Sequence, residues 1–190
     1  SLKMASAITH FIVGASLALP AAEWRTLRAV LPGWAIPVTA GLLAVASDLD
    51  TPLMQTLDLP HGGLWSHRGF FHSPFFIALL CASLAAITAR RHGSRAILPL
   101  AAVWAGCMLT HPLLDMLTDG GSGVLLLFPF SGERLFFPWH PIRVSPLSIA
   151  RFFSRAGPIL RSELPFCAAA SAIGLAGQWA CHRRRVAAEP

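Results

Sequence analysis

The chain has 190 residues, of which 54% are hydrophobic and 13% are charged, and its formal net charge is +6. A single water-facing domain of this composition would lack the polar residues to cover its surface, which excludes an ordinary soluble protein. The basic residues are scattered between apolar segments and form no separate basic domain, so no nucleic-acid partner is expected. The composition indicates an integral membrane protein.

Apolar segments recur along the whole chain, and each approaches the ~20 residues that cross a bilayer. They cover residues 5–20, 33–47, 70–89, 96–117 and 164–181. We therefore predict an all-α fold, a membrane helical bundle of about five apolar helices that forms a single domain over residues 1–190. Residues 1–3 are expected to be a non-native remnant ahead of a start at Met4.

The segments between these helices alternate in length. Residues 48–69 and 118–163 are long, whereas residues 21–32 and 90–95 are short. The short segments and the C-terminal tail carry the arginines Arg25, Arg28, Arg90, Arg91, Arg95, Arg183, Arg184 and Arg185. Basic residues near the ends of spans favour the cytoplasm, which predicts a multi-pass protein of the bacterial inner membrane with its long segments in the periplasm. Arginines in the long segments, such as Arg68 and Arg134, leave the opposite orientation open.

One part of the second long segment has the pattern of an interfacial helix. Residues 145–163 place Arg151 and Arg155 one turn apart beside Phe152 and Phe153. Arginines of this kind extend their charged ends from an apolar surface to the headgroups. We expect this helix to end near Pro158.

Histidines and aspartates gather at those segment ends that should share one membrane face. They are His10, Asp48, Asp50, His67, His72, His111 and Asp115. Each charge inside a bilayer costs roughly 2.5–3.5 kcal/mol at a helix centre, so such residues need partners or a polar site. Any one motif alone is explained as well by capping or by hydrogen bonding to backbone, but together they predict a metal centre at one membrane face.

The spacing within these motifs suggests how the ligands are presented. His111 and Asp115 are four residues apart, so a helix places both on one side, although Pro112 between them could kink or restart that helix. Asp48 and Asp50 are two residues apart and would point the same way only in an extended chain. Imidazole and carboxylate ligands suit zinc first, with manganese or iron as alternatives, and their number allows one or two ions.

Five motifs in the same order resemble a known family. ITHFIVGASLAL (8–19), SDLDTP (47–52), SHRGFFHSP (66–74), THPLLDMLTDGG (110–121) and LLLFPFSGERLFFPW (125–139) resemble bacterial inner-membrane metal-dependent hydrolases of the LexA-regulated YdjM type. That family is distantly similar to the zinc-dependent phospholipase C and single-strand nuclease superfamily. The resemblance implies an all-helical metal-dependent hydrolase with His10, His67, His111 and Asp115 as metal ligands, and with Asp48 or Asp50 near the attacking water.

These residues predict a hydrolase of phosphoric esters. Asp48 and Asp50 are the candidate catalytic residues, and Asp50 joins His10, His67, His72, His111 and Asp115 as a candidate metal ligand. Arginine donates two hydrogen bonds to one phosphate, so Arg68 and Arg134, with Ser73, are the candidate substrate-binding residues. A site at the membrane face suits a phospholipid or a polyprenyl phosphate. The alternative is a membrane metal-binding or metal-transport protein without hydrolytic activity, although few polar groups lead towards the arginine-bearing face.

Overall fold

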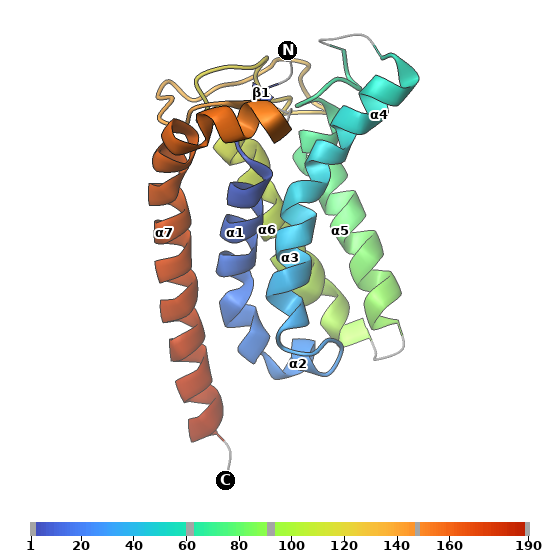
Figure 1. The fold of residues 1–190 in the computed structure, drawn as a ribbon. Helices are drawn as coiled ribbons and strands as arrows, with labels where there is room; N and C mark the ends of the chain where they lie inside the picture. The colour runs from blue at the N-terminus through green and yellow to red at the C-terminus, as the bar shows by residue number, and fades with distance from the viewer. Residues whose placement is uncertain (1–2, 60–62, 91–93, 147–148, 189–190) are drawn as a thin grey trace.

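The fold is known from a computed structural model, which describes residues 3–59, 63–90, 94–146 and 149–188 (Figure 1). The described elements, in chain order, are β1 (Lys3–Met4), α1 (Ala7–Ala18), η1 (Leu19–Glu23), α2 (Arg25–Arg28), α3 (Ala35–Ala46), η2 (Ser47–Leu49), α4 (Asp50–Leu57), η3 (Phe70–His72), α5 (Pro74–Ala89), η4 (Ser94–Ala96), α6 (Ile97–Met116), β2 (Ser145–Pro146) and α7 (Ile149–Ala187). Elements labelled η are 3₁₀-helices. The two strands pair in an antiparallel manner over two residues each, so the predicted all-α class holds for the body of the fold.

The long helices form a bundle whose two ends differ. α1, α3, α5, α6 and the descending part of α7 run side by side (Figure 1). The N-terminus, α4 and the loop between α6 and α7 lie at one end, whereas α2 and the C-terminus lie at the other. We call these the loop end and the arginine end.

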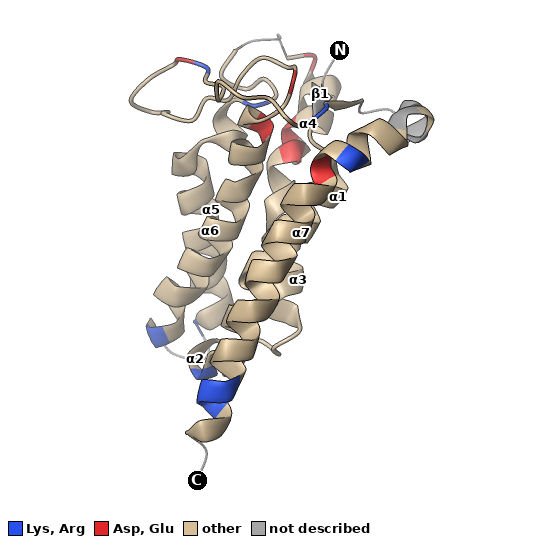
Figure 2. Ribbon diagram, turned by 90° about the vertical axis from the view of Figure 1, so that its left-hand side faces the viewer, with Lys and Arg blue, Asp and Glu red and all other residues tan. Residues whose placement is uncertain are grey.

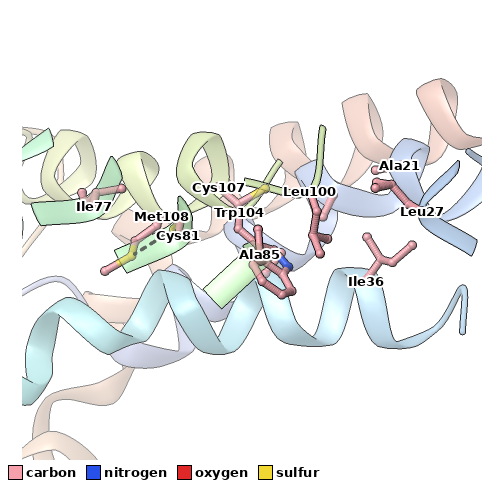
Figure 3. Packing of buried hydrophobic residues seen from close by; sticks show 12 residues of the cluster. Ala21, Leu27, Ile36, Ile77, Cys81, Ala85, Leu100, Trp104, Cys107 and Met108 are labelled. Atoms are coloured by element: carbon pink, nitrogen blue, oxygen red, sulfur yellow. Dashed lines mark hydrogen bonds between the residues drawn. The ribbon is translucent and has the colours of Figure 1, made fainter. Parts of the chain in front are cut away.

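The centre of the bundle is packed with apolar side chains from α3, α5 and α6. Leu100, Trp104 and Met108 of α6 are buried against Ile36 of α3 and Cys81 of α5 (Figure 3). The Trp104 indole N–H donates to Thr39 Oγ1 at 3.0 Å, so the one polar atom of this ring is satisfied. This core holds α6, which ends at the candidate site.

Glycines let α1 approach its neighbours closely. A Cβ on Gly14 would lie 2.5 Å from the Ala44 Cβ of α3, and a Cβ on Gly174 of α7 would lie 1.9 Å from the Ser16 carbonyl oxygen. Small residues at helix contacts are typical of membrane bundles. They bring the second half of α1 directly against α3 and α7.

Two helices of the described chain are long and apolar enough to cross a bilayer, fewer than the five predicted spans. They are Ser94–Met116 and Ala156–Ala187. Ala7–Glu23 and Pro74–Ala89 are also apolar but shorter, with 17 and 16 residues. α3 has 12 residues and rises only about 18 Å, because an α-helix rises ~1.5 Å per residue.

Charged residues avoid the length of the bundle. Arginines mark the arginine end, and the acidic residues at the loop end lie where the helices finish (Figure 2). Arg91, which was counted with the arginine end, lies outside the described residues. The sides of the helices between the two ends are free of charge in this view, as expected for a surface in lipid.

Prolines bend helices here without ending them. The expectation that the 145–163 helix ends near Pro158 is wrong, because α7 continues through Pro158 and Pro165 to Ala187. Its first part crosses the loop end of the bundle and its second part descends beside α1 (Figure 1). A proline removes one backbone hydrogen bond, which allows a bend. The side chains of Arg151 and Arg155 lie outside the described part of the chain.

Candidate metal centre

Helix ends from the whole chain meet at the loop end. His10 comes from the start of α1, Asp48 from η2, Asp50 from the start of α4, His72 from η3, and His111 with Asp115 from the end of α6. His67 lies in the loop before η3. Three overlapping groups of these residues bring ligand atoms within 4.8 Å of one another: His10, His111 and Asp115; Asp48, His72 and His111; and Asp50, His67 and His72. The structure therefore brings together all the predicted metal ligands.

Three donor atoms, on Asp48, His72 and His111, lie close enough to hold one ion, and Asp115 Oδ2 lies beside the two histidines. His72 Nε2 is 3.1 Å from His111 Nε2 and 3.5 Å from Asp115 Oδ2. Asp48 Oδ1 is 3.3 Å from His111 Nε2 and 3.9 Å from His72 Nε2. Tetrahedral zinc with bonds of ~2.0–2.1 Å places its ligand atoms roughly 3.3 Å apart. The spacing of this donor set fits a divalent metal ion.

Several polar atoms of the cluster are buried without a hydrogen-bond partner. They are both ring nitrogens of His10, both oxygens of Asp48, His67 Nε2 and Asp115 Oδ2. An unpaired buried polar atom costs about 1–3 kcal/mol, so a fold that holds these six together needs something that binds them. Acceptor atoms of neutral imidazoles and carboxylates are the ligands of such metals.

The carboxylate of Asp115 divides its two oxygens between different tasks. Oδ1 accepts the Arg68 Nη2 hydrogen bond at 3.1 Å and the Ala5 amide at 3.2 Å. Oδ2 has no partner and lies 3.6 Å from His111 Nε2. The saturated oxygen fixes the direction of the carboxylate and leaves the other free to bind.

His111 is oriented in the same way. Its Nδ1 lies 2.6 Å from the Ala44 carbonyl oxygen, so Nδ1–H donates to the backbone and Nε2 presents its lone pair to the cluster. A hydrogen bond from the second ring nitrogen is a regular feature of metal-binding histidines. The His10 ring stacks on the other face of His111, with centroids 3.6 Å apart. α6 runs unbroken through Pro112, so His111 and Asp115 share a helix face as the four-residue spacing predicts.

Asp50 holds two histidines at once. His67 Nδ1 lies 3.0 Å from Asp50 Oδ1, and His72 Nδ1 lies 3.2 Å from Asp50 Oδ2. Burial by itself would raise the pKa of Asp50, but the interactions with His67 and His72 outweigh it and hold that pKa well below the usual range. Asp50 is thus an ionised partner of both rings.

Asp48 and Asp50 reach the cluster from a helical segment. η2 and α4 follow α3 without a break, and both aspartates are buried. They meet different partners, Asp48 facing His111 and Asp50 facing His67. This agrees with their two-residue spacing, which would place both on one side only in an extended chain.

The three predicted substrate-binding residues make contacts within the protein. Arg68 is fully buried and also donates to Thr118 Oγ1 and the Gly120 carbonyl. Ser73 caps the N-terminus of α5, where its Oγ accepts from the Phe76 amide. Arg134 donates to the carbonyls of Gly63, His67 and Gly123 and so joins two loops. Burial by its surroundings, with Arg68 nearby, lowers the pKa of Arg134.

Two supporting groups have no signal in the sequence. Glu163 of α7 accepts hydrogen bonds from the Ser6 amide, the Ser6 hydroxyl and the Thr9 hydroxyl at 2.6–2.8 Å. It thereby fastens the start of α1, beside the Ala5 amide that holds Asp115. Glu163 lies more than 150 positions from Ser6 and Thr9 in the chain, so their contact cannot be predicted from the sequence. The Ala5 amide cannot be predicted either, because nearly every residue type has a backbone N–H.

Together, the fold and the site define an all-helical membrane protein with a buried imidazole–carboxylate cluster at one end. Residues 4–185 match the family model of the YdjM inner membrane protein, and the chain belongs to this family. It is similar to the inner membrane protein YbcI of Escherichia coli (strain K12), with 36% identity over 127 residues, or 65% of this chain and 70% of YbcI. No solved structure matches the chain. The family resemblance and the inner-membrane location are confirmed.

Proposed function

We propose that the protein is a membrane-bound metal-dependent hydrolase that cleaves a phosphoester bond in a lipid headgroup. The observation that carries this proposal is the set of four donor atoms on Asp48, His72, His111 and Asp115, which lie 3.1–3.9 Å apart in the pairs measured. Those four residues would hold one ion, and His10 or the Asp50–His67 pair could contribute to a second. A bound zinc ion would polarise the ester and lower the pKa of a water molecule.

Asp48 is placed to act as the general base that accepts the proton of the attacking water. Its side chain is 9% exposed, the largest exposure in the cluster, and both its oxygens lack a partner. As the water oxygen bonds to phosphorus and the bond to the leaving oxygen breaks, one Asp48 oxygen would accept the water proton and pass it to the leaving oxygen, which departs as the alcohol. Asp50, engaged with two histidines, acts by orienting them.

The surroundings of the site favour an amphipathic substrate. Trp65 is 50% exposed and Trp139 is 65% exposed, and both belong to loops at the loop end. Tryptophan is enriched where a protein meets the interface of the bilayer. A phospholipid or a polyprenyl phosphate would place its phosphate at this depth.

The hydrolysis proposal is tested on purified protein in lipid vesicles. With zinc supplied, we expect release of a water-soluble headgroup or of phosphate from one member of a panel of phospholipids and polyprenyl phosphates. His111→Ala and Asp115→Asn should lower the rate by at least about 100-fold, because each removes a ligand. His182→Ala, at the arginine end, is the matched control and should keep the wild-type rate. Equal rates for all four folded proteins would refute the proposal, and stoichiometric metal with no hydrolysis would favour the metal-binding alternative.

We further propose five membrane crossings, by Ala7–Glu23, α3, α5, α6 and the descending part of α7, with the loop end in the periplasm. The arginine end carries Arg25, Arg28, Arg90 and Arg95, which favours its retention in the cytoplasm.

This orientation is tested by cysteine labelling in a variant with Cys167 and Cys181 replaced by alanine. Trp139→Cys should react with a membrane-impermeant thiol reagent in intact spheroplasts. Val186→Cys, which is 50% exposed at the other end, should react only after lysis. The reverse pattern would invert the orientation, and labelling of both positions in intact spheroplasts would contradict the crossing by the descending part of α7 that separates them.

A further inference from the structure

Asp48 is the residue of the cluster with the largest exposed fraction and so lies nearest the protein surface, while its two carboxylate oxygens are themselves buried. His10, Asp50, His72, His111 and Asp115 are fully buried. His67 is 4% exposed and Asp48 is 9% exposed. A substrate phosphate would therefore meet the cluster on the side of Asp48. The surface next to Asp48 then decides what the rest of the substrate touches.

That surface is an apolar line along one continuous helical run. α3, η2 and α4 follow one another from Ala35 to Leu57 without a break, and Asp48 lies within this run. Val38, Leu42 and Leu49 are 38%, 59% and 65% exposed. Their separations of four and seven residues place them on one face of a helix. We call these three residues the leucine track.

The length of the track matches one leaflet of a bilayer. The rise from Val38 to Leu49 is about 16 Å at ~1.5 Å per residue. That is about half of the ~30 Å hydrocarbon core. The track begins beside Asp48 at the loop end and descends along α3 through the charge-free part of the bundle (Figures 1 and 2). It is thus continuous with the surface that faces lipid.

We propose that the leucine track binds the hydrocarbon tail of a phosphorylated lipid whose headgroup lies at Asp48. This inference rests on the proposed function for the chemistry at the headgroup, and it adds where the tail lies and that the substrate enters sideways from the bilayer. A tail in the bilayer is already out of water, so the track acts by packing contacts that orient the lipid. The substrate is then a lipid of the leaflet at the loop end, with at least one tail long enough to follow α3.

The tail position is measured by photolabelling, which needs no turnover. The protein is placed in phosphatidylcholine vesicles with a trace of phosphatidic acid that carries a photoactivatable group in the middle of its tail. We expect label on residues 38–49 to exceed label on Phe75 and Leu79 several-fold, and unlabelled phosphatidic acid to suppress it. Phe75 and Leu79 of α5 are the matched control surface, since they are 48% and 58% exposed and α5 also starts beside the cluster. Equal labelling of the two surfaces, or labelling that excess lipid does not reduce, would overturn the proposal.

A second measurement uses variants that stay apolar and so remain compatible with insertion. In the Leu42→Ala/Leu49→Ala protein, the ratio of kcat/KM for a long-tailed to a short-tailed substrate should fall about fivefold, because the lost carbon–carbon contacts are individually weak. Leu79→Ala should leave that ratio at the wild-type value. An unchanged ratio in the double variant would count against the track. If label is localised to residues 38–49 but no hydrolysis is found, the proposed function is overturned and the tail site stands. If hydrolysis is found but the label is uniform, the tail site is overturned and the proposed function stands.

Discussion

At the scale of single residues, the candidate centre depends on how each carboxylate divides its oxygens. Asp115 gives Oδ1 to Arg68 and to the Ala5 amide and keeps Oδ2 free. Asp50 gives both oxygens to protein groups, including the Arg68 amide at 3.2 Å. Neither oxygen of Asp48 has a hydrogen-bond partner in the protein. The three aspartates therefore differ in their surroundings, and in the proposed reaction Asp115 would be a ligand fixed in direction, Asp50 a holder of histidines and Asp48 the carboxylate that meets the water.

Arg68 provides the most informative substitution among these residues. Its backbone has a positive φ of 63°, and its guanidinium is buried against Asp115 at 3.1 Å. Arg68→Met should weaken zinc binding by about 10–100-fold, because partners of metal ligands contribute that much to affinity. It should also lower the free energy of unfolding by about 3–5 kcal/mol, since it leaves a buried carboxylate without its ion pair.

The control for Arg68 lies at the opposite end of the molecule. Arg185 Nε is 2.9 Å from Glu23 Oε2, so Arg185→Met also breaks an arginine–carboxylate contact. Zinc affinity, measured by competition with a chelator, should stay at the wild-type value in Arg185→Met. If both variants bound zinc as tightly as the wild type, Arg68 would have no part in the centre.

At the scale of helices, close packing around α1 sets the position of His10. A Cβ at position 174 would lie 1.9 Å from a backbone oxygen of α1, which no side-chain movement can relieve. Gly174→Ala should therefore cost about 1–3 kcal/mol of stability through overpacking. The same change at Gly106, an exposed helical position with nothing within 4 Å, should be neutral or stabilise by up to about 1 kcal/mol. Thermal unfolding in detergent measures both, and equal Tm values for the two variants would show that α7 does not pack on α1 as described.

The helices also show where prediction from the sequence fails. The spacing of His111 and Asp115 predicts their shared helix face, which the structure confirms despite Pro112. The prolines of α7 predict a helix end that does not occur. The prediction rests on the backbone hydrogen bond that each proline removes, and it takes no account of the packing of α7 on the rest of the bundle. Five spans were expected from apolar content, yet only two helices of the described chain have the required length, and the apolar run of α3 stops at Ala46, just before Asp48 and Asp50.

At the scale of the whole molecule, the two ends of the bundle differ in their charged and polar residues: the His and Asp cluster lies at the loop end and the arginines of the short segments lie at the arginine end. The alternation of long and short segments predicts that the His and Asp motifs meet at one end, and the structure brings them together there. Which oxygen of which aspartate remains free could not be predicted, because it depends on contacts such as Ala5 with Asp115, 110 positions apart. The helical fold class and the convergence of the His and Asp residues were thus readable from residue types, while the supporting groups required the three-dimensional arrangement.

The central claim is that the buried cluster binds a metal ion, and elemental analysis of the purified protein tests it most directly. The wild type, purified without chelator after growth with supplied zinc, should carry at least about one zinc or similar divalent ion per chain. His111→Ala/Asp115→Asn should lose most of this metal, whereas His182→Ala should keep it, with circular dichroism showing that each protein is folded. A wild-type protein without stoichiometric metal, or a folded His111→Ala/Asp115→Asn protein with the wild-type content, would contradict the account.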